Sequence, residues 1–222
     1  MIASKPSSRR GSGRRALFPL TAALCAAALP AYRAIAPGWS APEGAAYSAV
    51  IDSRVAHSGR SSLHLQSVSP GASEYAVRQL VRADAYRGKR VLLSGWIKPN
   101  TRPFGAALWL RVDMRNGDYV LDSMLGVSPE AIAASKDGWV RCELVADVPA
   151  DALGLAFGVR MKGSGEVWAD DLKIANVDRS VPTTTIERRP YRAPDKDAAV
   201  QRMHRQYAAA PLHPVNMSFE EH

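Results

Sequence analysis

The stretch Ala107-Leu-Trp-Leu-Arg-Val-Asp-Met-Arg-Asn-Gly-Asp-Tyr-Val-Leu-Asp-Ser-Met124 decides the fold class. In its first half Leu108, Leu110 and Val112 alternate with mostly polar residues, which is typical of a strand with one buried face. Asn116-Gly117 then predicts a tight type I′ turn, and a second β-rich run follows it. The stretch therefore predicts an antiparallel β-hairpin.

Runs of the same kind continue on both sides of this hairpin. Short clusters of turn-forming residues separate most of them, and no long helical pattern lies between them. Strands without intervening helices indicate an antiparallel sandwich or barrel. We expect an all-β fold of about nine strands, at 46–52, 61–67, 76–82, 91–98, 106–113, 119–124, 139–147, 155–162 and 166–174.

The composition fits one domain with tails. The chain has 222 residues, of which 46% are hydrophobic and 23% charged, as in a globular protein. Its two cysteines, Cys25 and Cys142, are too few for a disulfide framework or a cysteine-based zinc site. Cys142 alternates with polar neighbours, so we expect a buried structural thiol and not a nucleophile.

The net charge of +8 is unevenly distributed. Residues 1–38 carry +6, residues 39–178 carry 16 basic and 16 acidic side chains, and residues 179–222 carry +2. A nucleic-acid-binding domain needs its excess of cations on the folded surface that meets phosphate. The neutral central region therefore argues against nucleic acid as a partner.

The N-terminus has the order of a secretory signal peptide. A stretch rich in arginine precedes an alanine-rich apolar run over 16–31, which is short for a membrane span and contains two prolines. We expect residues 1–36 to be a signal peptide, cleaved after Ala31, Ala34 or Ala36, and the mature protein to be exported, either periplasmic or secreted. The alternatives are an uncleaved N-terminal anchor, the only membrane contact we expect, or a start codon placed too far upstream.

One face of the 107–113 strand carries candidate ligand-binding residues. Trp109, Arg111 and Asp113 point away from the apolar set, so they should lie on the outside of a sandwich. An aromatic ring packs on the C–H faces of a sugar, and charged groups bond its hydroxyls. The alternative is that Trp109 is covered by a loop or by side chains of neighbouring strands, because large aromatic residues are more often buried. Trp96, which follows Gly95, is expected in the core.

Several short motifs occur in a fixed order along the central region. They are Asp52 followed by His57-Ser-Gly-Arg-Ser-Ser-Leu63, Ser94-Gly-Trp-Ile-Lys98, Asp147-Val-Pro149 and Val167-Trp-Ala-Asp-Asp-Leu172. In this order they resemble galactose-binding-like jelly-roll modules, which include many bacterial carbohydrate-binding modules. The resemblance covers about 46–178 and implies a jelly-roll β-sandwich with a carbohydrate or glycan as ligand. Similar modules also occur in bacterial regulators.

The resemblance also implies a possible metal site. In such modules a structural calcium joins an acidic residue of the final strand to carbonyls of the His-Ser-Gly turn, which here means Asp170 and Asp171 near residues 58–60. The alternative is that the two carboxylates bond backbone groups of that turn. The Asn-x-x-Phe-Glu string that often opens these modules is missing before Tyr47, and a similar string, Asn216-Met-Ser-Phe-Glu220, lies near the C-terminus.

The sequence divides into a signal segment at 1–36, a β-sandwich at 40–178 and a tail at 179–222. Asp195 predicts the N-cap of a helix to about residue 210, and the string at 216–220 is either a remnant of another module or a strand that completes this sandwich.

No motif of a hydrolase, metalloprotease, phosphate loop or dinucleotide site is present, and we expect no cofactor apart from the possible calcium. We therefore expect a non-catalytic exported module that binds carbohydrate; the alternatives are an envelope protein-interaction or scaffold domain and a ligand-sensing domain of a regulator.

Overall fold

The computed structural model describes residues 32–44, 46–69, 74–100, 105–123, 135, 137–184, 187–190 and 195–221. Residues 1–31, most of the predicted signal peptide, lie outside this set. The remainder of the predicted segment forms strand β1 (Tyr32–Ala36), which pairs antiparallel with β2 (Trp39–Pro42). The described part of the sandwich therefore includes Tyr32–Ala36, which lie before the expected boundary at residue 40. No helix in these ranges is long and apolar enough to cross a membrane.

Every strand predicted from the alternating pattern is present. The described residues also contain β1, β2 and a short β12 (Glu187–Arg189), together with a turn of 3-10 helix, η1 (Ala83–Ala85), and a helix, α2 (Lys196–Ala208). The predicted strands are β3 (Tyr47–Asp52), β4 (Ser62–Ser67), β5 (Tyr75–Arg82), β6 (Arg90–Asn100), β7 (Ala107–Met114), β8 (Tyr119–Ser123), β9 (Val140–Asp147), β10 (Ala152–Met161) and β11 (Glu166–Val177).

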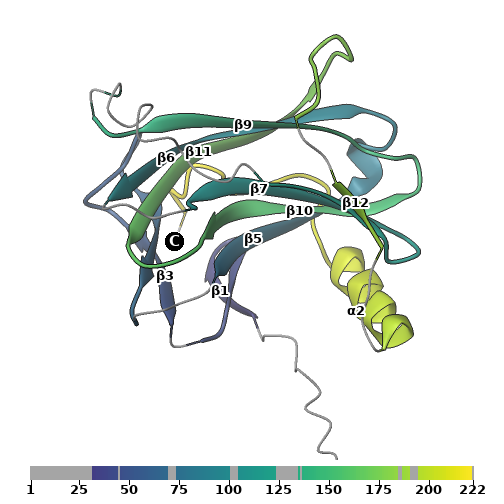
Figure 1. Cartoon of the computed structure of the whole chain (residues 1–222), viewed down its shortest axis with the longest axis horizontal. Helices are drawn as coiled ribbons and strands as arrows, with labels where there is room; N and C mark the ends of the chain where they lie inside the picture. Colours follow the sequence, from purple (N-terminus) through teal and green to yellow (C-terminus); the bar gives the residue numbers. More distant parts are fainter. Residues whose placement is uncertain are drawn as a thin grey trace, which may run out of the picture.

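The strands form two antiparallel sheets that pack face to face as a jelly-roll β-sandwich (Figure 1). The larger sheet has seven strands in the order β1-β2-β5-β10-β7-β8-β12, and the smaller has five in the order β3-β4-β11-β6-β9. Their inner faces meet in one core of alternating apolar side chains. Cys142 belongs to this core, as predicted, and burial raises the pKa of its thiol to about 11.

The β7–β8 hairpin forms as predicted, but its turn differs from the predicted type. Met114 N donates to Asp118 O at 2.8 Å, which leaves Arg115, Asn116 and Gly117 in the loop. Of these only Gly117 has a positive φ, at 90°, whereas a type I′ turn requires two such residues. Asn116 instead accepts a hydrogen bond from the Asp118 N–H at 3.0 Å, so the expected I′ turn is wrong and a three-residue loop replaces it.

The C-terminal segment after α2 is an integral part of the sandwich. It runs along the edge of β5, where Arg82 N donates to Pro211 O at 2.9 Å. It then enters the core, where Phe219 is fully buried and its ring centroid lies 4.9 Å from that of Trp39. The Trp39 indole N–H donates to Asn216 O at 2.9 Å. The string at 216–220 thus completes the sandwich, although as irregular chain and not as a strand.

Glu220 fixes the end of this segment to the turn before β4. Its carboxylate accepts hydrogen bonds from Arg60 N at 2.8 Å and from Ser61 N at 3.0 Å. These two backbone N–H groups lower the pKa of Glu220, so this anchor weakens when acid protonates the carboxylate.

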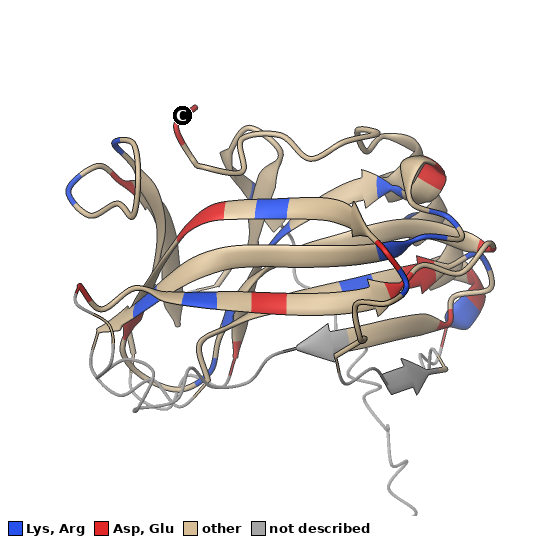
Figure 2. Ribbon diagram, turned by 90° about the horizontal axis from the view of Figure 1, so that it is seen from above, with Lys and Arg blue, Asp and Glu red and all other residues tan. Residues whose placement is uncertain are grey.

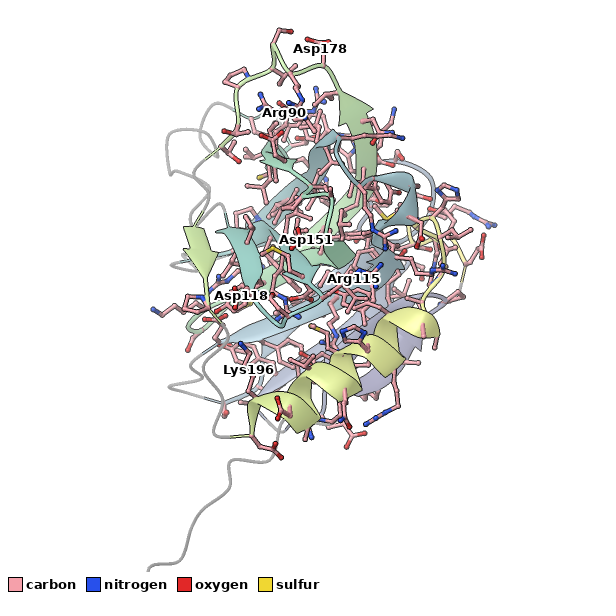
Figure 3. The ribbon with its side chains drawn as sticks, turned by 90° about the vertical axis from the view of Figure 1, so that its right-hand side faces the viewer. Arg90, Arg115, Asp118, Asp151, Asp178 and Lys196 are labelled. Atoms are coloured by element: carbon pink, nitrogen blue, oxygen red, sulfur yellow. The ribbon has the colours of Figure 1, made fainter. Side chains whose placement is uncertain are left out.

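Helix α2 lies along the outer side of the seven-stranded sheet, beside the hairpin that carries Arg115 and Asp118 (Figure 3). It begins after the predicted N-cap, Asp195, whose side chain accepts a hydrogen bond from Ala198 N at 3.2 Å. His204 of the helix contacts Arg115 O at 2.9 Å. The helix therefore covers part of the sheet face that the candidate ligand-binding residues occupy.

We expect Phe219→Ala to lower the free energy of unfolding by about 3–5 kcal/mol, because it removes a buried ring and leaves a cavity beside Trp39. Leu212→Ala is the control, since Leu212 lies in the same segment with 46% of its surface exposed; it should change stability by less than about 0.5 kcal/mol. Urea unfolding of both variants tests this. Equal stabilities would show that the C-terminal segment does not close the core.

Candidate functional site

Strand β7 places Trp109, Arg111 and Asp113 together on the outer face of the seven-stranded sheet, as its alternation predicts. On this strand Leu108 and Leu110 point into the core between the sheets. Strand β10 lies beside β7, and between Gly154 and Gly158 it presents almost no side-chain bulk outward, because its outward positions there are Gly154, Ala156 and Gly158. The three predicted residues therefore border a strip of sheet with a nearly bare backbone.

Trp109 lies against the sheet. Its indole N–H donates to Val77 O on β5 at 3.2 Å, so the ring reaches across β10, where Gly158 is its partner in register. A Cβ at Gly158 would approach Val77 O to 2.2 Å, so the close approach of β10 to β5 at this point requires glycine. Only 8% of Trp109 is exposed. The ring is thus held by neighbouring strands, as the alternative interpretation of this residue expected.

Asp113 links Arg111 to helix α2. Its Oδ2 accepts from Arg111 Nη2 at 2.9 Å and from the Tyr207 hydroxyl at 2.6 Å. Tyr207 packs on Gly154, where an added Cβ would come within 2.0 Å of the ring. Burial, together with the charge of Asp113, raises the pKa of Tyr207, which keeps the hydroxyl protonated as a donor. Arg111 retains 33% side-chain exposure, so part of its guanidinium faces solvent.

Two further arginines, which the sequence analysis did not select, lie on the same face. Arg78 of β5 is aligned with Gly158, and its guanidinium lies 3.5 Å from the centroid of the Tyr32 ring. Arg160 of β10 donates to Glu74 at 2.8 Å. Both arginines alternate with buried residues in their strands, and that pattern places them outward. The strand order β5-β10-β7 brings them beside Arg111, and the sequence of a single strand does not predict this order.

Asp170 and Asp171 lie on β11 beside the turn that carries His57 and Ser58. Asp170 accepts hydrogen bonds from His57 N at 2.9 Å, from Ser58 N at 3.1 Å and from Asp171 N at 2.7 Å. Burial raises the pKa of Asp170, although these three N–H groups oppose the shift. Asp171 has a φ of 50° at an irregular point of the β11–β6 pairing, and this turns its carboxylate toward His57 Nδ1 at 2.7 Å and Ser58 Oγ at 2.8 Å.

The turn therefore presents N–H groups to Asp170, where a calcium ion would need oxygen atoms. This arrangement is the hydrogen-bonded alternative to the metal site. In the ranges that the structure describes, no three histidine, cysteine or acidic side chains are grouped so as to hold a metal ion. A structural calcium at Asp170 and Asp171 stays a prediction.

Trp96 differs from its expected place in the core. It lies on the outer face of the five-stranded sheet, half-buried, with its ring stacked on His57 at 4.1 Å between centroids. Gly95 points inward instead, and an added Cβ there would come within 3.0 Å of the Leu172 side chain. The edge of His57 also meets Trp139, with centroids 5.5 Å apart. Basic and acidic residues are interspersed over the strands of this sheet, so it has no single sign of charge (Figure 2).

The described residues do not assemble a familiar catalytic arrangement. Ser58 Oγ donates to Asp171 and not to a histidine nitrogen, so the contact that activates a serine nucleophile is missing in this cluster. Asp113 and Glu143 face outward from different sheets, which separates them too widely to act as a glycosidase pair.

Comparison with known proteins adds a relative and several structural neighbours. No family model matches the sequence. The chain is 33% identical over 173 residues to the uncharacterized HTH-type transcriptional regulator YbfP of Bacillus subtilis (strain 168). The match covers 77% of this chain and 52% of the regulator, so the chain spans about half the length of the curated relative it matches.

Among solved structures the neighbours include carbohydrate-binding modules, the class that the sequence motifs resemble. One is the C-terminal family 22 module of Clostridium thermocellum Xyn10B, with 16% identity, a TM-score of 0.47, and coverage of 63% of this chain and 85% of that one. Another is the CBM22-1 xylan-binding domain of Paenibacillus barcinonensis Xyn10C, with 17% identity, a TM-score of 0.46, and coverage of 65% and 89%. A third is TmCBM61 in complex with β-1,4-galactotriose, with 14% identity, a TM-score of 0.43, and coverage of 64% and 91%.

Proposed function

We propose that this chain is a non-catalytic binding module that takes a carbohydrate on the outer face of the seven-stranded sheet, over β5, β10 and β7. One observation carries the proposal: three arginines of these strands lie beside the Trp109 ring and the Tyr32 ring of β1 on one sheet face. Saccharides are recognised by a few fixed polar groups set among aromatic and apolar surface. The residues concerned are Tyr32, Arg78, Trp109, Arg111, Asp113 and Arg160.

The polar groups on this face suit hydroxyl recognition. A sugar hydroxyl can accept a hydrogen bond, and an arginine supplies several donors in a fixed plane. Arg111 is held by Asp113, and Asp113 by Tyr207, so the donors are positioned before a ligand arrives. Such positioning reduces the entropy lost on binding. Trp109 supports this arrangement from below, as a ring fixed to the sheet.

A second candidate is a ligand-sensing domain of a regulator, and the similarity to the Bacillus regulator favours it. Both candidates use a binding face on the same sandwich. In the first candidate, binding attaches the protein to a glycan. In the second, binding changes gene expression. An exported protein cannot act on DNA inside the cell, so the location of the chain distinguishes them.

We expect Arg111→Gln to weaken saccharide binding by about tenfold or more, because hydrogen bonds from a charged donor contribute about 1.5–3 kcal/mol. The measurement is retention on a glycan array, followed by titration of tryptophan fluorescence with the saccharide that is retained best. Arg141→Gln is the matched control. Arg141 lies on the outer face of the other sheet and pairs there with Glu143, and its loss changes the net charge equally.

Full affinity in Arg111→Gln would place the ligand elsewhere on the molecule. If the wild-type protein retains no saccharide on the array, the carbohydrate proposal fails, and an envelope protein-interaction domain becomes the better candidate.

We propose further that the chain is exported and that its mature N-terminus lies at or just before Tyr32. Strand β1 pairs with β2, and Tyr32 packs on Arg78, so cleavage after Ala34 or Ala36 would remove part of the sheet. N-terminal sequencing of protein recovered from the native host should therefore begin near Tyr32. An intact Met1 on protein recovered from the cytoplasm would contradict export and favour the regulatory candidate.

A further inference from the structure

Among the described side chains on the outer face of β5, β10 and β7, arginines outnumber carboxylates. Arg78, Arg111 and Arg160 lie on the adjacent strands β5, β7 and β10. The carboxylates that pair with them within the described residues are Asp113, with Arg111, and Glu74, with Arg160. Two acidic groups therefore face three guanidinium groups, and one positive charge is left over.

Arg78 holds the unbalanced charge. Within the described residues it forms no ion pair, and its guanidinium contacts the Tyr32 ring instead. The charge of Arg111 acts on Arg78 unfavourably, while Asp113 is already bonded to Arg111 and Tyr207. Burial is the main cause that lowers the pKa of Arg78, and Arg111 lowers it further, while Tyr32, Tyr207 and Asp113 oppose the shift.

The same three arginines also lack a hydrogen-bond partner at one atom each. In the part of the chain that the structure describes, the buried side-chain nitrogen and oxygen atoms without a hydrogen-bond partner are the Nε atoms of Arg78, Arg111 and Arg160. Buried polar groups in folded proteins are nearly always bonded, and buried charges are nearly always paired. The Nε atoms are themselves buried, so a ligand of this face would have to reach the terminal nitrogen atoms of these three side chains.

We propose that the ligand of this face is an acidic saccharide, whose anionic group pairs with Arg78. This inference rests on the proposed carbohydrate function and specifies the class of sugar. A guanidinium whose flat side rests on Tyr32 directs its N–H groups outward within its plane, and this geometry suits two-pronged pairing with a carboxylate. A sulfate ester presents the same kind of oxygen acceptors, so the shared chemistry is an oxyanion on the sugar.

The test is an array of uronic-acid oligosaccharides, their carboxyl-reduced neutral counterparts and sulfated galacto-oligosaccharides. The wild-type protein should prefer an acidic oligosaccharide to its neutral counterpart by about tenfold or more, as for a charge-assisted hydrogen-bonded pair. This preference should shrink when the salt concentration is raised from about 0.05 M to about 0.5 M, because salt screens partly exposed charges. The carboxylate and sulfate arms identify which oxyanion the face accepts.

Arg78→Gln should abolish the preference for the acidic oligosaccharide, whereas Arg141→Gln, with the same change in net charge, should keep it. Thermal melts of both variants check that they fold. The comparison of acidic with neutral oligosaccharides on the wild-type protein does not depend on the variants. Equal retention of acidic and neutral oligosaccharides by the wild-type protein would overturn the acidic assignment and leave the carbohydrate function standing. A preference that survives in folded Arg78→Gln would overturn the role of Arg78, and retention of no saccharide would overturn both proposals.

Discussion

The outer surface of strand β10 is the constraint on which the candidate site depends. Because Gly154 and Gly158 carry no side chains, Tyr207 and Trp109 can lie directly against the backbone of the sheet. Larger residues at these positions would meet Tyr207 at 2.0 Å and Val77 O at 2.2 Å. The packing of Tyr207 on the sheet would then be lost, and β10 would be pushed away from the Val77 carbonyl that accepts from Trp109. The two glycines thus permit the contacts that hold Tyr207 and Trp109 on this face of the sandwich.

The three arginines on this face differ in their ion pairs. Asp113 is shared between Arg111 and Tyr207, and Glu74 pairs with Arg160, so the described residues neutralise two of these three arginines. Keeping an unpaired guanidinium half-buried costs stability. A ligand that supplies the missing charge would recover this cost on binding.

Local patterns predicted the parts of the molecule that depend on neighbours in sequence. Alternation with a period of two placed Trp109 on the outer face and Cys142 in the core, and both placements are as expected. The association of Arg78 with that face depends on the order of strands distant in sequence, which alternation does not encode. The same applies to Phe219, which enters the core beside a tryptophan 180 positions away. Trp96 was misplaced because glycine and tryptophan in succession do not show which of the two points inward.

The central claim is that a saccharide binds to the outer face of the seven-stranded sheet. The most direct measurement is the shift of backbone amide resonances in a ¹⁵N-labelled protein during titration with the oligosaccharide that the array retains best. The account predicts that the largest shifts map to β5, β7 and β10 and to the indole N–H of Trp109. Shifts confined to β6 and β9, around Trp96 on the opposite sheet, would contradict it.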